Sequence, residues 1–92
     1  MENFEWHKEK ADLNIKKHNV SFEESLTVFD DPLGIYKPDD EHSISEERGY
    51  LIGNSYKNRL LVVSFTERNN KIRIITARLA TKNERKYYEN QS

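Results

Sequence analysis

The sequence predicts a single α+β domain, in which helices cover one face of a curved antiparallel sheet. The chain of 92 residues is long enough for one hydrophobic core but not for two, so residues 1–92 are expected to form one domain. Two β-rich runs flank a pair of Asn residues in the C-terminal half, as in a β-hairpin. Two Ser/Thr-x-x-Glu motifs, Ser21–Glu24 and Thr81–Glu84, mark helix starts. The expected order of elements is β-α-α-β-β-β-β-α.

The N-terminal segment predicts a short edge strand followed by a helix. Phe4–Trp6 places two aromatic side chains on one side of an extended segment, which indicates either an edge strand or an aromatic latch, with a structural role in both cases. His7 to His18 is predicted to be helical, because an apolar stripe recurs there at helical spacing. Asn19 is a suitable left-handed terminator for this helix. The stripe consists of Ala11, Ile15 and His18.

A second helix is expected directly after the first. Ser21–Glu24 has the spacing of a capping box, in which the hydroxyl accepts from the third-residue amide and the Glu side chain reaches back. A one-sided apolar stripe follows at helical spacing, and Asp30–Pro32 ends the helix. The stripe consists of Phe22, Leu26 and Phe29.

The middle of the chain predicts two strands separated by a polar loop. Leu33–Tyr36 is a weak strand, and Lys37–Glu47 is a loop with Pro and a run of acids. That acidic run is expected to be solvated rather than to bind a hard cation, so no metal site is predicted. Gly49–Tyr56 is a stronger strand, in which Gly53 indicates either a bulge or a close backbone approach.

The C-terminal third predicts a hairpin and a last helix. Leu60–Thr66 is apolar at consecutive positions, as expected of a central strand buried on both faces. Glu67–Lys71 supplies the turn, and Ile72–Arg78 returns as the second strand. A second capping box, Thr81–Glu84, then opens a short helix from about Lys82 to Glu89.

The net charge of −1 hides two halves of opposite sign. Residues 1–47 carry 13 acids and 5 bases (−8), whereas residues 48–92 carry 3 acids and 10 bases (+7). The basic half indicates a polyanionic partner, unless the two halves simply pair with each other in the fold. The chain has no cysteine, no apolar signal region and no apolar run near the roughly 20 residues that a membrane span needs. A cytoplasmic protein is therefore expected.

Arginine dominates the candidate functional residues of the basic half. Its planar guanidinium donates two parallel hydrogen bonds to phosphate and keeps its charge at physiological pH. Arg73 and Arg78 lie five residues apart, so an ideal strand would point them to opposite faces. They can serve one site only if the strand ends or bends near Thr76 and Ala77.

Each of these candidates also has an ordinary structural explanation. Arginines along a strand edge commonly form surface ion pairs, and Glu67 beside Arg68 is either a turn ion pair or a general base. One of Tyr87 and Tyr88 is expected to pack on the sheet. The three His residues are scattered, and His18 is expected to be a core or interface residue because it lies on the apolar stripe.

Taken together, these segments resemble the BrnT family, toxins of type II toxin–antitoxin modules. The resemblance spans nearly the whole chain in order and spacing. Two positions depart from the family pattern: His7 stands where Asp is common, which removes a possible helix cap, and Asn19 stands where Gly is common. The matching segments are Phe4–Trp6, Lys17–Glu24, Val28–Pro32, Glu47–Arg48, Ile52–Gly53, Arg59–Val63, Thr66–Arg68, Ile72–Arg78, Ala80–Thr81, Glu84–Arg85 and Tyr88.

The resemblance implies a compact RelE-like fold and a ribonuclease activity that blocks translation. It also implies neutralisation by a BrnA-type antitoxin that carries a ribbon-helix-helix DNA-binding domain. Operator DNA would be contacted only through that antitoxin, in a complex that represses its own operon and has a possible higher-order assembly. No cofactor is implied.

A mechanism consistent with these residues is metal-independent cleavage, in which the 2'-hydroxyl of the RNA attacks the adjacent phosphorus. Arginines would stabilise the charge on the phosphoryl oxygens, with Arg73 and Arg78 as first choices and Arg68 next. The expected RNA-binding residues are Lys17, Arg48, Arg59, Lys82 and Arg85.

The same mechanism needs groups that move protons. Glu67 or His18 would accept the 2'-hydroxyl proton, and Tyr88 or Lys82 would orient or protonate the leaving oxygen. The alternative is a non-enzymatic binding module, whose basic sheet face docks an acidic protein segment or nucleic acid. Such a charge-only binder tolerates Arg-to-Lys changes and loses affinity steeply with salt, whereas a catalytic arginine does not tolerate the change.

Overall fold

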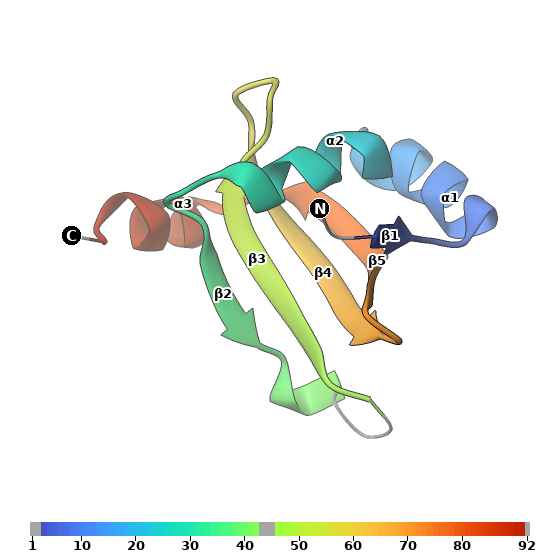
Figure 1. Cartoon of the computed structure of the whole chain (residues 1–92). Coiled ribbons are helices and arrows are strands. Elements are labelled where there is room, and N and C mark those ends of the chain that lie inside the picture. Colours follow the sequence, from blue (N-terminus) through green and yellow to red (C-terminus); the bar gives the residue numbers. More distant parts are fainter. Residues whose placement is uncertain (1–2, 43–45, 92) are drawn as a thin grey trace.

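The computed structural model describes residues 3–42 and 46–91, so part of the predicted Lys37–Glu47 loop, residues 43–45, lies outside the described residues. The predicted order of strands and α-helices is confirmed (Figure 1). Two 3-10 helices add to it: η1 extends the second helix, and η2 lies within the acidic loop. The elements are β1 (Asn3–Glu5), α1 (Lys8–His18), α2 (Phe22–Leu26), η1 (Thr27–Asp30), β2 (Ile35–Pro38), η2 (Asp40–His42), β3 (Arg48–Asn54), β4 (Leu60–Arg68), β5 (Lys71–Leu79) and α3 (Lys82–Glu89).

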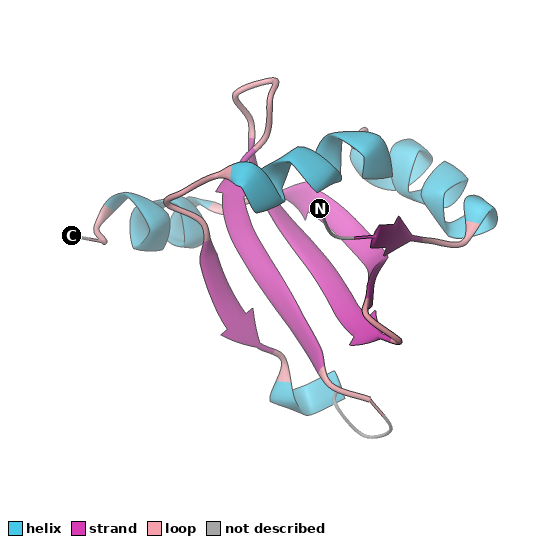
Figure 2. Cartoon of the chain, in the orientation of Figure 1, coloured by secondary structure: helices cyan, strands magenta, loops and turns pink. Residues whose placement is uncertain are grey.

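The sheet has five strands in the order β1-β5-β4-β3-β2 (Figure 2). Strands β2 to β5 form an antiparallel meander, as predicted. Strand β1, however, pairs with β5 in parallel, from Asn3 beside Lys71 to Glu5 beside Arg73. The expectation of a purely antiparallel sheet is therefore wrong at this edge. The direction in which a three-residue strand pairs depends on where the following helices return the chain, which local patterning does not reveal.

The helices pack on both faces of the sheet, and not on one face as predicted. One face holds the larger core, in which Val20, Phe22 and Val28 pack with residues of β4 and β5 such as Leu61 and Val63. Full burial of side chains of this size stabilises the fold by about 1.5–3 kcal/mol each. On the opposite face, α3 contributes a buried Tyr to a smaller cluster. That cluster consists of Ile52, Leu60, Val62 and Tyr88.

The buried face of α1 differs from the predicted apolar stripe. Ile15 is 46% exposed, whereas Asn14 is 5% exposed and forms the contact with the sheet. Its side-chain amide donates to the carbonyl oxygens of Val20 (2.9 Å) and Ala77 (2.7 Å), and its oxygen accepts from the Ala77 amide (3.1 Å). Ala77 lies beyond the reach of the short strand β1, so its outward backbone groups need these partners. A buried polar residue thus replaces the expected apolar contact.

The turns and helix ends largely follow the sequence. Helix α1 starts after His7, which makes no side-chain cap, and ends at Asn19 in the left-handed region (φ 56°). The hairpin between β4 and β5 turns on Asn69 (φ 54°) and Asn70 (φ 63°), the backbone angles of a type I′ turn. Gly53 lies in regular register but close to η1 and the residue after it, since an added Cβ would lie 3.0 Å from Val28 and 3.1 Å from Asp31. The expected close approach is confirmed there.

The two predicted capping boxes have different outcomes. At α3 the box is complete: the Thr81 hydroxyl accepts from the Glu84 amide (3.2 Å), and the Glu84 carboxylate accepts from the Thr81 amide (2.8 Å). At α2 the Ser21 hydroxyl accepts from the Glu24 amide (3.0 Å), but the Glu24 carboxylate turns instead to residues of the β3–β4 turn region. Only half of the first box therefore forms.

Candidate active site

A row of charged residues crosses one face of the sheet. Arg48 on β3 lies opposite Thr66 on β4, Thr66 lies opposite Arg73 on β5, and Arg73 lies beside Glu5 on β1. Residues paired across neighbouring strands project from the same face. Arg68 is two positions beyond Thr66 on β4 and therefore projects from this face as well. Strand pairing thus gathers three arginines and a carboxylate in one region.

A β-bulge adds Arg78 to the same face. The β4–β5 pairing shifts at Ser64 and Phe65, whose partners are Thr76 and Ile74, so Ile75 has no partner on β4. Beyond the bulge Arg78 lies opposite Val62, which shares a face with Thr66 because the two are four residues apart on β4. The extra residue restores the phase of the strand. This is the bend near Thr76 that a single site for Arg73 and Arg78 requires.

Three of these arginines are held by glutamates. Arg73 Nε donates to Glu5 Oε2 (3.1 Å), and Arg68 Nη2 donates to Glu46 Oε2 (2.6 Å). Arg78 makes a bidentate pair with Glu84, at 2.8 and 2.9 Å. The arginine side chains remain 29% (Arg73), 47% (Arg68) and 38% (Arg78) exposed, so their guanidinium groups face solvent in part. We name the region formed by Arg48, Arg68, Arg73, Arg78, Glu5, Glu46 and Glu84 the arginine face.

Ion pairs also join the acidic half of the chain to the basic half. Glu5, Glu24 and Glu46 from the acidic half pair with Arg73, Arg59 and Arg68 from the basic half. The alternative that the two halves pair in the fold is therefore confirmed for these residues. The glutamate partners therefore neutralise part of the positive charge of the arginine face, while its guanidinium groups stay partly exposed.

The electrostatics of the arginine face favour the ionised forms of its acids. The hydrogen bond from Arg68 lowers the pKa of Glu46, with further contributions from the charges of Arg48 and Arg73. The hydrogen bonds from Arg78 lower the pKa of Glu84 to about 2, against a partial desolvation that raises it. The paired arginines have raised pKa values for the reciprocal reason. Glu46 and Glu84 are therefore charged partners of arginine and weak proton acceptors.

Glu67 lies away from the arginine face. Its partner on β5 is Ile72, whose side chain belongs to the core beneath α2. The turn comprises only Asn69 and Asn70, so Glu67 belongs to strand β4 and alternates in direction with Arg68. Glu67 instead lines a hollow of about 370 Å³ on the sheet face that α2 and η1 cover, with Tyr36 among its neighbours. The predicted role of general base for Glu67 does not fit this placement.

His18 and Lys17 lie at the end of α1, beside the bulge of β5. They line a hollow of about 190 Å³ together with Ile75 and Thr76. His18 is half-buried, as expected of a residue that packs between the helix and the sheet. The structure thus places His18 near the arginine-bearing strand and on the packing side of α1.

Two predicted site residues are held in structural networks. The Arg59 guanidinium pairs with Glu24, through Nε (2.9 Å) and Nη2, and also donates to the Asn19 carbonyl (3.0 Å). The Tyr88 side chain is 8% exposed, and its hydroxyl donates to Asp31 (2.6 Å). Burial, together with the hydrogen bond to Asp31, raises the pKa of the Tyr88 phenol, which makes it a poorer proton donor. These contacts assign both residues to the fold.

The remaining basic residues among the predicted site residues lie on α3. Lys82 and Arg85 are exposed, and Arg85 forms a loose pair with Glu89 (3.8 Å) on the same helix. Tyr87 is 50% exposed and lies under the ammonium group of Lys37 (4.6 Å to the ring centroid). Of the two tyrosines, Tyr88 is therefore the one that packs, as predicted for one of the pair.

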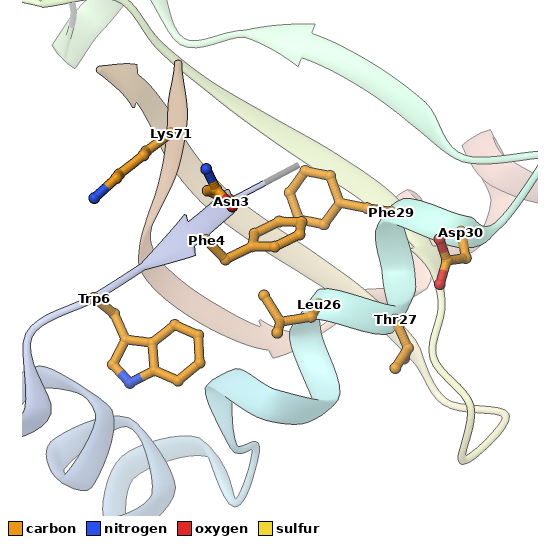
Figure 3. A pocket seen from close by; sticks show the side chains of 8 residues that line it. All are labelled: Asn3, Phe4, Trp6, Leu26, Thr27, Phe29, Asp30 and Lys71. Atoms are coloured by element: carbon orange, nitrogen blue, oxygen red, sulfur yellow. The ribbon is translucent and has the colours of Figure 1, made fainter. Parts of the chain in front are cut away.

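A separate hollow of about 740 Å³ opens on the sheet face that α2 and η1 cover (Figure 3). Phe4 on β1, Trp6 just after β1, Leu26 on α2 and Phe29 on η1 point into it. The two aromatic residues that flank Glu5 thus anchor this segment on the side opposite Glu5. Sequence reasoning missed Glu5 as a site residue, although its position between two apolar residues was a signal that it faces the other way.

The described part of the chain contains no cluster of three or more His, Asp or Glu residues arranged to hold a metal ion. Among the described helices, none combines the length and apolarity needed to cross a membrane. The arginine face itself presents guanidinium groups and carboxylates, and guanidinium groups suit recognition of phosphodiesters.

Comparisons with known proteins identify the family of this chain and a solved structure with a similar fold. The family model described as "Ribonuclease toxin, BrnT, of type II toxin-antitoxin system" matches residues 6–84. The crystal structure of the Brucella abortus ribonuclease toxin BrnT matches with a TM-score of 0.69 and 19% identity, covering 89% of this chain and 100% of that one. The search of curated proteins gave no match. Because the family model covers most of the chain, this protein belongs to the BrnT family of ribonuclease toxins from type II toxin–antitoxin systems.

Proposed function

We propose that this toxin inhibits translation by cleaving RNA at the arginine face, with the substrate's own 2'-hydroxyl as the nucleophile. The observation that carries the proposal is the alignment of Arg48, Arg68, Arg73 and Arg78 on one face by strand pairing and a bulge. A phosphodiester bound there meets several partly exposed guanidinium groups at once. Charge that develops on the phosphoryl oxygens is stabilised by donors that are already in place.

Arg73 is the central residue of this proposal. It lies between Thr66 and Glu5 in the row across the sheet, and it is half-buried, which limits its motion. Its Nε is held by Glu5, and its side chain is still 29% exposed, so we propose that its terminal nitrogens bind the phosphate. Arg68 and Arg48 flank it, and Arg78 extends the cationic track toward α3. Exposed Lys82 and Arg85 on α3 continue this track along the RNA backbone.

The cellular setting follows from the same proposal. We infer that a BrnA-type antitoxin with a ribbon-helix-helix domain neutralises the toxin in the cytoplasm, and that operator DNA is contacted through the antitoxin alone. We also propose that residues 1–92 form a single toxin domain. Covering the arginine face would block access of RNA, and the complex would assemble further on the operator.

The test is cleavage of an end-labelled RNA by purified protein in excess EDTA. We expect the wild type to cleave, and Arg73→Ala to lose about 10²–10³-fold in rate, as for removal of one preorganised donor to a transition-state oxyanion. Lys8→Ala is the control, because Lys8 is exposed on α1 and pairs only with its neighbour Asp12 among the described residues. Equal cleavage by wild type and Arg73→Ala would place the active site elsewhere.

The binding-module alternative has its own signature in the same experiment. Arg73→Lys keeps the charge but loses the planar donor array. RNA affinity that survives this change, falls steeply with salt and is accompanied by no cleavage on naked RNA or on translating ribosomes would support simple docking. Loss of cleavage with retained RNA binding supports the enzyme.

A further inference from the structure

Among the carboxylates of the arginine face, Glu5 is the one that lies within a paired strand, and it accepts a hydrogen bond from one arginine. Glu5 lies on β1, which is locked to β5 by parallel pairing at Glu5 beside Arg73. Its side chain is 28% exposed, and its Oε2 accepts from Arg73 Nε at 3.1 Å. The charge of Glu5 also contributes to the raised pKa of Arg68, so both arginines lie within its field.

The neighbours of Glu5 in the sequence fix its direction. Phe4 packs edge-to-face on Phe29, with ring centroids 5.2 Å apart, and Trp6 packs similarly on Phe22 at 5.8 Å. Both rings lie on the sheet face that α2 and η1 cover, so the residue between them must project to the opposite side, which is the arginine face. Groups that act on a substrate need such support, because small displacements cost rate. The aromatic pair therefore serves to position Glu5.

Three other carboxylates that lie near these arginines in the sequence or the fold suit a proton-accepting role less well. Glu84 has a pKa lowered to about 2, and its two oxygens are shared between Arg78 and the cap of α3. The pKa of Glu46 is also lowered, by its hydrogen bond to Arg68. Glu67 is on the opposite face. A carboxylate whose pKa is lowered by its arginine partner is a weak proton acceptor, and a carboxylate on the opposite face of the sheet cannot reach a substrate bound to the arginines.

We propose that Glu5 is the general base that accepts the 2'-hydroxyl proton of an RNA substrate whose phosphodiester is held by Arg73 and Arg68. The inference rests on the proposed ribonuclease function and assigns to Glu5 the role that the sequence assigned to Glu67 or His18. Arg73 then links the two tasks, since its Nε holds the base and its remaining nitrogens face the phosphate.

The step balances without a further reactant. The 2'-hydroxyl transfers its proton to the Glu5 carboxylate as the bond between the 2'-oxygen and phosphorus forms. The bond from phosphorus to the 5'-oxygen breaks, and that oxygen takes a proton from solvent water. Glu5 returns its proton to solvent. The products are a 2',3'-cyclic phosphate and a 5'-hydroxyl end, which can be identified on the cleaved RNA.

The deciding variant is Glu5→Gln. The Gln amide oxygen still accepts from Arg73 Nε, so a residue that only positions Arg73 tolerates this change, whereas a base does not. We expect a loss of about 10²–10⁴-fold in cleavage rate with RNA affinity within a few-fold of wild type. The wild-type rate should rise with pH along an acid limb, and that limb should be absent in Glu5→Gln. Glu9→Gln, an exposed acid of α1, is the matched control.

A second variant separates chemistry from folding. Glu5→Asp keeps a proton acceptor on a shorter stem, so it should recover part of the rate and the acid limb that Glu5→Gln lacks. Melting curves of both variants should match the wild type, because the Glu5 side chain is only part-buried. Partial recovery with Asp supports the base even if Gln proves unstable, and Asp as inactive as Gln overturns it.

The outcomes also distinguish the two proposals. If Glu5→Gln cleaves at the wild-type rate while Glu67→Gln does not, the base is misassigned and the ribonuclease proposal stands. If the wild type cleaves neither naked RNA nor RNA on translating ribosomes, both proposals fail together. Products that end in a 3'-phosphate without a cyclic intermediate would overturn the 2'-hydroxyl route and Glu5 with it.

Discussion

Two Arg–Glu pairs of this molecule look alike in the sequence and differ in the structure. Arg59–Glu24 and Arg73–Glu5 each join a C-terminal strand region to an N-terminal element. The arginines are similarly exposed, at 27% and 29%, but Glu24 is 1% exposed and Glu5 is 28% exposed. Glu24 is also bound by the Ser55 hydroxyl at 2.7 Å. The buried carboxylate ties the fold together, whereas the part-exposed one remains accessible to a substrate.

The difference teaches that ion pairing alone does not identify a functional arginine. The hydrogen bond from Arg59 lowers the pKa of Glu24 despite the opposing effect of burial, with help from Ser55. Such a pair resists exchange with a phosphate, because opening it leaves a buried charge without its partner. A part-exposed pair such as Arg73–Glu5 is less costly to rearrange when a phosphate binds the free nitrogens of the arginine, since water screens both groups.

The largest expected effect on stability is the loss of the buried partner. Glu24→Ala leaves Arg59 without its carboxylate, and breaking a buried pair in this way costs about 3–5 kcal/mol in the free energy of unfolding. Glu5→Ala removes a part-exposed pair and should cost about 0–1 kcal/mol. Urea denaturation of both variants measures the contrast. Equal losses would show that the two pairs have the same structural role.

The next effect concerns Tyr88, which belongs to the same class of buried polar contacts as Glu24. Tyr88→Phe removes its hydrogen bond to Asp31 and should cost about 1.5–3 kcal/mol, as for hydrogen bonds to charged groups. Tyr87→Phe is the control, because Tyr87 is half exposed. Thermal or urea unfolding reports the difference. If Tyr88→Phe instead lost RNA cleavage at unchanged stability, the sequence-based role of Tyr88 as an acid would be restored.

The smallest expected effect is the pH dependence of stability due to Glu84 on the arginine face. Its folded-state pKa of about 2 lies below the ordinary value of 4.5, so the unfolded state binds more protons between these limits. The stabilisation is therefore complete above about pH 5 and is lost as the pH falls toward 2. After allowance for solvent screening of Arg78, we expect about 1–2 kcal/mol. Glu84→Gln should flatten the slope of stability against pH in this window.

Several parts of the site follow from local sequence. Arg73 and Arg78 were identified from their residue type, and their common face required a bend that the structure supplies at Ile75. The placement of Glu67 differs from the expected one because of turn length: a five-residue turn was expected, whereas Asn69 and Asn70 alone form it. A shorter turn extends the strand by two residues, and period-2 alternation then decides which face each side chain takes.

The sequence by itself determined the order of the elements and most of their ends, because capping residues, Asn turns and apolar periodicity act over a few neighbouring residues. Only the tertiary structure decided the parallel pairing of β1, the bulge at Ile75 and the partner of Glu24. Ser21–Glu24 and Thr81–Glu84 share one local motif, yet Glu84 completes its cap and Glu24 does not. For the buried carboxylate of Glu24, a hydrogen-bonded arginine that is distant in the sequence is a stronger partner than the backbone amide at the start of its own helix. Such a contact exists only once the chain has folded.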